Sequence, residues 1–217
     1  MECSTIIWKS GKDDLILTDR SVNITMAPRT TAQFEAIREK RREKIILAAM
    51  ELFSRQTYHN TSVADISKQA GVSKGLIYNY FTTKEDILNG ILDYLFAIGD
   101  QMVAETRAAG TPKEELRHLI GQVFRFLHQQ ALISRMLIPL ALEMGKFDFI
   151  NEVIDRKMRD YLGLLVQIFS DMDYPDPEME AWTLGVLFDG ISLDYNVLGD
   201  RMPLDRMEQY LYKKYNL

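Results

Sequence analysis

Apolar residues recur at helical spacing through most of the chain. Between residues 34 and 54, Ile45, Ala48, Ala49 and Leu52 follow the i, i+3, i+4, i+7 spacing of one helix face. Later segments repeat this period, and no interior segment alternates convincingly between apolar and polar residues as a strand would. The pattern therefore predicts an all-α fold.

Polar residues, glycines and prolines indicate where the helices begin and end. Ser62 with Asp65 has the spacing of an N-terminal capping box, and Gly71 suits the left-handed residue that ends a helix. Thr111 is a cap of the same kind, and we expect the Ile138–Pro139 step to kink or end a helix. We expect about nine helices, over residues 34–54, 63–70, 73–81, 83–109, 112 to the proline step and a short piece beyond it, 148–169, 177–198, and the residues after 203.

Residues 62–81 combine two of these helices across a three-residue break. Val63, Ile66 and Ile77 are placed to face inward and to hold the two helices at an angle. This arrangement is a helix-turn-helix, whose second helix enters the major groove of DNA. The second helix is too short to be stable alone, so it must gain its stability from packing on the first.

The polar residues of this segment suit contact with DNA. Serines at helix N-termini favour phosphate, Lys74 can reach guanine or phosphate, and Gly75 lets the backbone approach closely. Two alternatives remain open: the tyrosines can be core aromatics, and Lys84 can be an ordinary surface charge. The expected contacts are Ser62, Ser73, Lys74, Gly75, Tyr78, Asn79 and Lys84.

Charge is divided unevenly along the chain, whose net charge is −5. Residues 26–90 hold ten Lys and Arg against seven Asp and Glu, a net of +3, whereas residues 91–217 have a net of −7. Local positive charge attracts a polyanion. The basic cluster from Arg38 to Lys44 can reach flanking phosphates, or it can be a solvated helix face with i,i+4 pairs.

The segment TSVADISKQAGVSKGLIYNYFTTKEDIL, residues 61–88, resembles the DNA-binding part of the tetracycline-repressor-like (TetR) family of bacterial transcriptional regulators. The similarity extends over about residues 37–90. It implies a homodimer in which residues 26–82 form the DNA-binding domain. Residues 83–217 would form a helical domain for effector binding and dimerisation. Leu76 replaces a residue that is polar in many members, so the operator sequence cannot be inferred.

Residues 1–25 show no helical period and precede a second methionine, Met26. Met26 is a plausible true start, which would make these residues an extension that is not native.

The helix expected over residues 181–199 is apolar, and its glycines permit close approach of another helix. In the resembled family the last two helices pair across the dimer, although an ordinary core helix would have the same composition. The resemblance places the interface at Trp182, Val186, Asp189, Gly190, Leu193 and Val197.

The chain contains eleven methionines, which are adaptable in binding surfaces. Aromatic, histidine and methionine residues of the C-terminal half are therefore candidates for an effector pocket, with plain core packing as the alternative for each. They are Phe124, His128, Met136, Met144 and Tyr161.

Signals for other classes are missing from the sequence. It has no HExxH, no phosphate-binding glycine loop and no nucleophile elbow, so we predict no enzyme activity, no metal and no cofactor. One cysteine, Cys3, and the lack of a long apolar span or secretory signal indicate the cytoplasm.

We predict a dimeric repressor that binds double-stranded DNA and is released by a small-molecule effector of unknown identity. Two alternatives are a helix-turn-helix adaptor controlled by a protein partner and a small α-helical enzyme.

Overall fold

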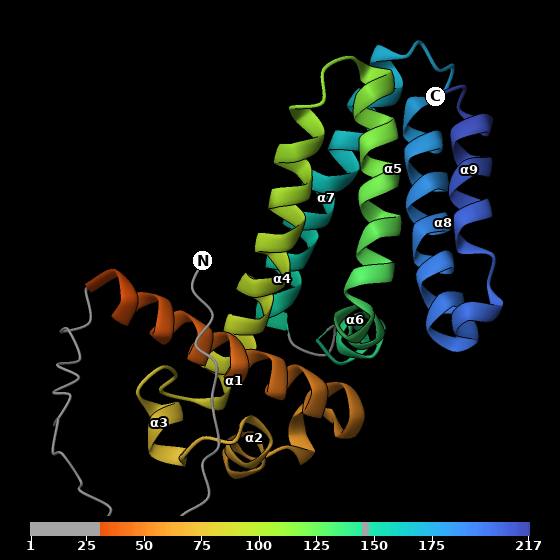
Figure 1. Ribbon diagram of the computed structural model, residues 1–217. Coiled ribbons are helices and arrows are strands. Elements are labelled where there is room, and N and C mark those ends of the chain that lie inside the picture. Colours follow the sequence, from red (N-terminus) through yellow and green to blue (C-terminus); the bar gives the residue numbers. More distant parts are fainter. Residues whose placement is uncertain (1–30, 145–147) are drawn as a thin grey trace, which may run out of the picture.

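The computed structural model describes residues 31–144 and 148–217, with the side chains of residues 143, 144 and 148–150 left aside. This part of the chain forms nine α-helices and one 3-10 turn and contains no strand, which confirms the all-α prediction (Figure 1). The expectations for residues 1–25 lie outside it. The helices are α1 Thr31–Asn60, α2 Val63–Ala70, α3 Lys74–Tyr78, α4 Lys84–Arg107, α5 Pro112–Gln129, α6 Ala131–Met144, α7 Asp148–Asp171, α8 Pro177–Leu198 and α9 Leu204–Lys214, with η1 Gly199–Arg201 between the last two.

The helices pack around two hydrophobic cores. The first joins α1, α2 and α3 to the beginning of α4 and includes Ile45, Ile66 and Ile77, each fully buried. The second lies between α5, α7, α8 and α9, which stand side by side in Figure 1 and contribute Phe124 and Phe169. The helix-turn-helix therefore packs on a different core from the one between α5, α7, α8 and α9.

Helix α6 does not follow the division of the chain into an N-terminal and a C-terminal part. Its residues Ile133, Met136 and Leu140 are buried in the first core, although they come from the C-terminal half. In Figure 1 this helix lies at the junction between the α1–α3 group and the upright helices. The domain boundary expected after residue 82 stays a prediction. Helix α6 belongs to the C-terminal side of this boundary but packs into the core of the N-terminal side.

The expected caps form hydrogen bonds in the structure. Asp65 N donates to Ser62 Oγ at 3.1 Å, and Ser62 N donates to the Asp65 carboxylate at 2.9 Å. Equivalent boxes begin α4 at Thr83 and α5 at Thr111. The Ser62 side chain and backbone bonds lower the pKa of Asp65, so the charged, capping form of the carboxyl is favoured. Short polar motifs thus fix where these helices begin.

Two boundaries differ from the sequence prediction. Helix α1 runs on to Asn60 across a kink at Thr57, where a loop was expected. Pro139 does not end a helix, because α6 continues past it to Met144. Burial of Met136 and Leu140 holds this helix on both sides of the proline. The break falls earlier, at Gln130, whose backbone leaves the helical conformation.

Replacing Gly71 by alanine tests the left-handed turn between α2 and α3. Gly71 has φ of 61°, where a side chain is strained, so Gly71→Ala should lower the free energy of unfolding by about 1–2 kcal/mol. Urea denaturation measures the change.

The matched control is Gly163→Ala, at an exposed helical position in α7 where an added Cβ meets no atom within 4 Å. It should raise the free energy of unfolding by about 0.5–1 kcal/mol. Equal effects of the two substitutions would show that the turn at Gly71 does not require glycine.

Candidate functional site

The recognition helix α3 is only five residues long and is held by its buried side. Ile77 is fully buried and Phe81, just beyond the helix, is almost so. A Cβ added at Gly90 of α4 would lie 2.8 Å from the Phe81 ring, so this glycine makes room for the aromatic anchor. Ser73 caps the helix by accepting a hydrogen bond from Leu76 N at 3.1 Å. The short helix is thus fixed from both ends.

The opposite side of α3 presents polar groups to solvent. Tyr78 is 49% exposed and Lys74 Nζ lies 6.0 Å from the centre of its ring. Ser73, Gly75 and Asn79 are exposed beside them, and an added Cβ at Gly75 would meet no atom within 4 Å. Packing within the chain therefore does not account for this glycine. Tyr78 is not a core aromatic, whereas Tyr80 packs partly buried against the first core.

Ser62 is exposed but its hydrogen-bonding groups are already engaged. Its hydroxyl donates to the Asp65 carboxylate at 2.6 Å, and its backbone N–H donates to the same oxygen. The groups that remain for an anion at this end of α2 are the backbone N–H groups of Val63 and Ala64, because that of Asp65 donates to Ser62 Oγ. Ser62 therefore organises the end of α2.

Lys84, at the start of α4, points back into the chain. Its Nζ donates hydrogen bonds to Tyr58 O at 2.8 Å and Thr61 O at 3.0 Å, and it lies 4.1 Å from the centre of the Tyr58 ring. Burial lowers the pKa of Lys84 below its ordinary value. In the structure this ammonium ties α4 to the connection between α1 and α2, so Lys84 is not an ordinary surface charge. The expected contact of Lys84 with DNA stays a prediction.

That connection is a strained part of the backbone. Thr57 has φ of 70° and ψ of 159°, a region that β-branched residues rarely adopt. The hydroxyl of the buried Thr61 donates to Thr57 O at 2.8 Å. Together with Lys84, these bonds hold the turn that leads into α2.

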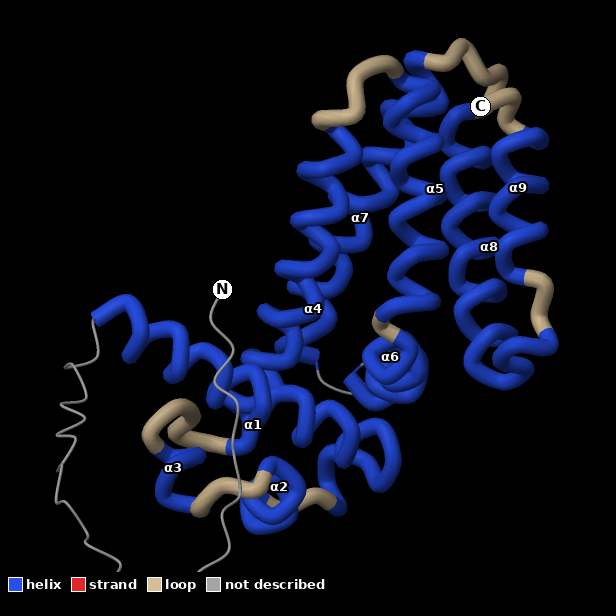
Figure 2. The backbone as a smooth tube through the Cα atoms, in the orientation of Figure 1, coloured by secondary structure: helices blue, strands red, loops and turns tan. Residues whose placement is uncertain are grey.

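Basic side chains of α1 border the helix-turn-helix. The guanidinium of Arg38 lies 5.8 Å from the Tyr80 ring centre, and that of Arg42 lies 5.7 Å from the Phe81 ring centre and pairs with Glu39 at 3.5 Å. The Lys44 ammonium approaches the turn at Gly71, and Lys40 and Arg41, which lie between Arg38 and Arg42, are exposed. The positive charge expected from the sequence therefore lies next to α3. Figure 2 shows α3 and the tan connections around it on the same side of α1.

A cavity of about 570 Å³ opens between α4, α5, α7 and α8. Its lining is mostly apolar and includes Met102, Leu162 and Phe188. Tyr161 is the one sequence candidate for an effector pocket that lines it. Burial, followed by the charge of Asp100, raises the pKa of Tyr161 to about 12, so the phenol is neutral at physiological pH.

The other effector-pocket candidates lie elsewhere. Phe124 is buried in the second core and Met136 in the first. His128 is exposed, and its Nε2 lies 3.1 Å from an Asp205 carboxylate oxygen. The side chain of Met144 is outside the described residues. The structure therefore does not bring these residues together, because they face different neighbours.

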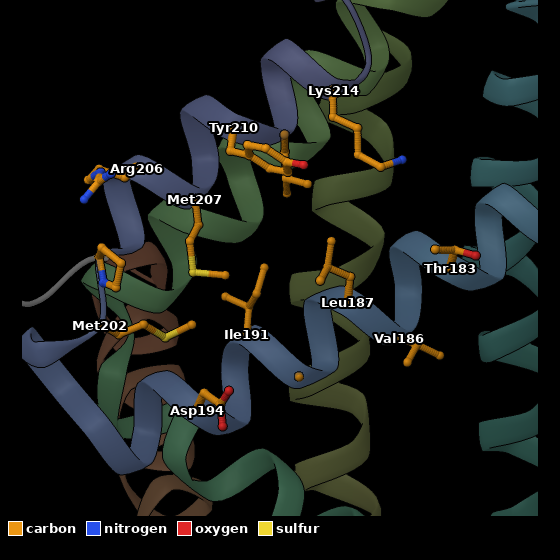
Figure 3. Close-up of a pocket in the computed structure, with 13 residues that line it drawn as sticks. Thr183, Val186, Leu187, Ile191, Asp194, Met202, Arg206, Met207, Tyr210 and Lys214 are labelled. Atoms are coloured by element: carbon orange, nitrogen blue, oxygen red, sulfur yellow. The ribbon is translucent and has the colours of Figure 1, made fainter.

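The residues expected at a dimer interface do not all lie at one surface hollow along α8. A groove of about 850 Å³ between α8 and α9 is lined by Val186 and Gly190, and Figure 3 shows Met207 and Ile191 pointing toward one another across it. Trp182 and Asp189 line the cavity between α4, α5, α7 and α8, and Val186 lines both hollows. Leu193 and Val197 are 48% and 68% exposed. Spacing along the chain could not separate these two sets.

Two further findings concern only the residues that the structure describes. No group of three or more His, Cys, Asp or Glu is arranged to hold a metal ion. No helix among them is both long and apolar enough to cross a membrane.

Comparison with known proteins finds a family model that matches the helix-turn-helix. The model of the bacterial regulatory proteins of the tetR family matches residues 45–91, which include α2, the turn and α3. The chain is 31% identical over 132 residues to the Fatty acid metabolism regulator protein of Bacillus subtilis (strain 168), covering 59% of this chain and 66% of that protein. The match to each of three curated relatives covers less than two thirds of that relative's length, namely 66%, 54% and 22%.

Solved structures share the arrangement of helices. NalD, the secondary repressor of the MexAB-OprM multidrug efflux pump in Pseudomonas aeruginosa, gives a TM-score of 0.63 at 22% identity, covering 83% of this chain and 95% of NalD. The fatty acid degradation regulator FadR of Bacillus halodurans gives 0.61 at 21% identity, covering 81% of this chain and 94% of FadR. These structures show that the chain shares their fold, and its helix-turn-helix matches the model of the bacterial regulatory proteins of the tetR family.

Lys84→Met tests whether the lysine is a structural tie. The substitution removes two hydrogen bonds from carbonyl groups in a partly buried turn, so the free energy of unfolding should fall by about 1–3 kcal/mol in a urea titration. Lys68→Met, at an exposed position of α2, is the control and should change it by less than about 0.5 kcal/mol. A Lys84 variant as stable as the parent would contradict the tie.

Proposed function

We propose that this protein is a dimeric transcriptional repressor that binds double-stranded DNA in the cytoplasm and is released by a small-molecule effector. The observation that carries the proposal is the two-sided character of α3. Ile77 and Phe81 fasten it to the first core, and Lys74, Tyr78 and Asn79 face solvent on the other side. A helix presented in this way fits the major groove, which admits an α-helix.

Each exposed group has a use in that groove. Lys74 can donate to the O6 and N7 acceptors of guanine, and the Tyr78 hydroxyl can donate to phosphate. The absence of a side chain at Gly75 permits close approach of the backbone to the duplex. We retain Ser73, Lys74, Gly75, Tyr78 and Asn79 as contacts, and we assign Ser62 and Lys84 to positioning because their polar groups bond within the chain.

A second copy is needed because one short helix reads few bases. The exposed stripe on α8 that includes Leu193 and Val197, next to the α8–α9 groove, offers an apolar surface for pairing with its own copy. Two-fold symmetry would then present two recognition helices to a palindromic operator.

The cavity between α4, α5, α7 and α8 is the proposed effector site. Its volume and apolar lining suit a small hydrophobic molecule. Relatives named as regulators of fatty acid metabolism and of a multidrug efflux pump support this choice. Val186 of α8 lines both this cavity and the α8–α9 groove, so a molecule bound in one would alter the shape of the other.

Helix α6 offers a route from α8 to the DNA-binding core. The Asn196 side chain of α8 donates to the carbonyl of the fully buried Ser134 at 3.1 Å, and the remainder of α6 packs against α1. We infer that effector binding shifts α8 and α6 together. The separation of the two recognition helices then no longer matches the operator, which lowers affinity by population shift.

Salt dependence separates a DNA contact from a positioning residue. Lys74→Ala should weaken binding to a specific genomic fragment by about 1–3 kcal/mol and lower the slope of log K against log salt by about 0.9, because one cation no longer displaces a counterion. Lys84→Met should weaken binding without changing the slope, because its ammonium is held by Tyr58 and Thr61.

Fluorescence anisotropy at four or more salt concentrations measures both slopes, and Lys113→Met, on the distant α5, serves as the charge-matched control. If the slope of log K against log salt falls by about one in Lys84→Met, Lys84 contacts a phosphate and is not only a positioning residue. Unchanged affinity and slope in Lys74→Ala would remove α3 from the DNA surface.

The dimer surface can be tested with a single charge. Leu193→Glu places a carboxylate on the exposed stripe of α8 and should convert the dimer to a monomer in sedimentation analysis, with at least a tenfold loss of operator affinity. Leu142→Glu is the control, since Leu142 of α6 is 71% exposed outside the stripe. A dimeric Leu193→Glu variant would exclude this stripe as the interface.

A further inference from the structure

We propose that the cavity between α4, α5, α7 and α8 binds an amphiphilic cation, an alkyl chain that carries an ammonium group, with the Asp189 carboxylate as its counter-charge. The inference rests on the proposed function only in taking this cavity as the effector site. It adds the chemical class of the ligand, which follows from the charges and aromatic rings of the lining.

The apolar part of the cavity is suited to an alkyl chain. Leu119 and Val123 of α5 and Leu162 and Leu165 of α7 supply branched aliphatic walls, and the space amounts to about 570 Å³. Such walls provide no hydrogen bonds, so binding there depends on removing apolar surface from water. A chain of methylene groups satisfies this requirement, whereas a sugar or a nucleotide does not.

The charges of the lining are Asp155 and Arg159 of α7 and Asp189 of α8. Asp155 and Arg159 are one helical turn apart, at a spacing where opposite charges offset each other. Asp189 comes from the facing helix and, among the described residues, its carboxylate has neither an ion pair nor a hydrogen bond. The unopposed charge of the cavity is therefore negative.

The surroundings of Asp189 disfavour its negative charge. Asp189 is exposed, yet the apolar groups around its carboxyl raise the pKa above the ordinary value, since they disfavour the charged form. A bound cation would offset this effect. An anionic head group in the same place would increase it, which disfavours a carboxylate ligand.

Rings and thioethers surround the same space. Tyr161, Trp182 and Phe188 line the cavity, as do Met102 and Met158. The faces of aromatic rings attract cations, and a quaternary ammonium is recognised by such rings without hydrogen bonds. Sulfur side chains adapt to the shape of the remaining surface. A head group without N–H donors can therefore be held by the carboxylate and the rings together.

The cavity contains its own fluorescent reporter. The sequence has two tryptophans, Trp8 and Trp182, and Trp182 lines the cavity. In a Trp8→Phe background, the full-length protein would be titrated with decyltrimethylammonium, decanoate and decanol, each below its micelle or solubility limit. The three probes share one chain length and differ in head-group charge.

We expect decyltrimethylammonium to change the Trp182 emission with at least tenfold higher affinity than decanoate, and decanol to fall between them. Asp189→Asn, which preserves shape and removes the charge, should reduce the preference for the cation to threefold or less. The matched control is Asp194→Asn on the same helix, because Asp194 lines the α8–α9 groove instead, and it should keep the parent's preference.

Decanoate that binds as tightly as the cation in the parent would overturn the proposal, as would an Asp189→Asn variant that keeps the full preference. Operator affinity measured on the same samples separates this result from the proposed function. A cation preference without any change in operator affinity would support the ligand class and remove the effector role. DNA release by decanoate alone would support the effector role and reject the ligand class.

Discussion

The proposed recognition helix α3 is too short to be stable alone, and the helices around it hold it in place. Five residues form too few hydrogen bonds to offset the cost of starting a helix. Burial of Ile77 and Phe81, at about 1.5–3 kcal/mol for each side chain, supplies what the backbone cannot. Gly90 leaves room for the Phe81 ring because it has no side chain. The left-handed backbone of Gly71 sets the angle between α2 and α3. The polar side of α3 is free for a partner because its apolar side is fully committed.

The same first core reaches into the C-terminal half through α6. Met136 and Leu140 pack with the helices that carry α3, while Ser134 on the same helix accepts a hydrogen bond from Asn196 of α8. Helix α8 in turn borders both the cavity and the groove beside α9. A packed helix moves as a unit, because close-packed interiors do not deform continuously. The cavity, the proposed dimer surface and the recognition helix are therefore joined by two helices.

Local chemistry was sufficient to predict much of this from the sequence. The capping boxes and the glycine turn depend on residues three or four apart, so the beginnings of α2, α4 and α5 were predicted correctly. Features that depend on residues far apart in the sequence were not predicted. Pro139 indicated a kink or a helix end, and burial of α6 on both sides of the proline keeps the helix from ending there. Lys84 donates a hydrogen bond to Tyr58 O, 26 residues earlier in the chain, and no local sequence pattern predicts such a contact.

The cavity illustrates the same limit. Tyr161 was the one effector candidate that lines it, and Asp189 was assigned to an interface because it lies on the expected stripe of α8. Helical spacing identifies a shared face but not the element that the face meets. The cavity walls come from four helices, whose arrangement depends on packing over the whole C-terminal half.

The central claim is that a symmetric dimer binds DNA through two copies of α3, each with its apolar side buried and its polar side exposed. Selection of bound duplexes from a random library by the purified full-length protein, followed by hydroxyl-radical footprinting, tests it directly. The account predicts an inverted repeat whose two protected half-sites lie about 10 base pairs apart, on one face of the duplex. Failure to enrich any sequence, or an enriched site without two-fold symmetry, would contradict it.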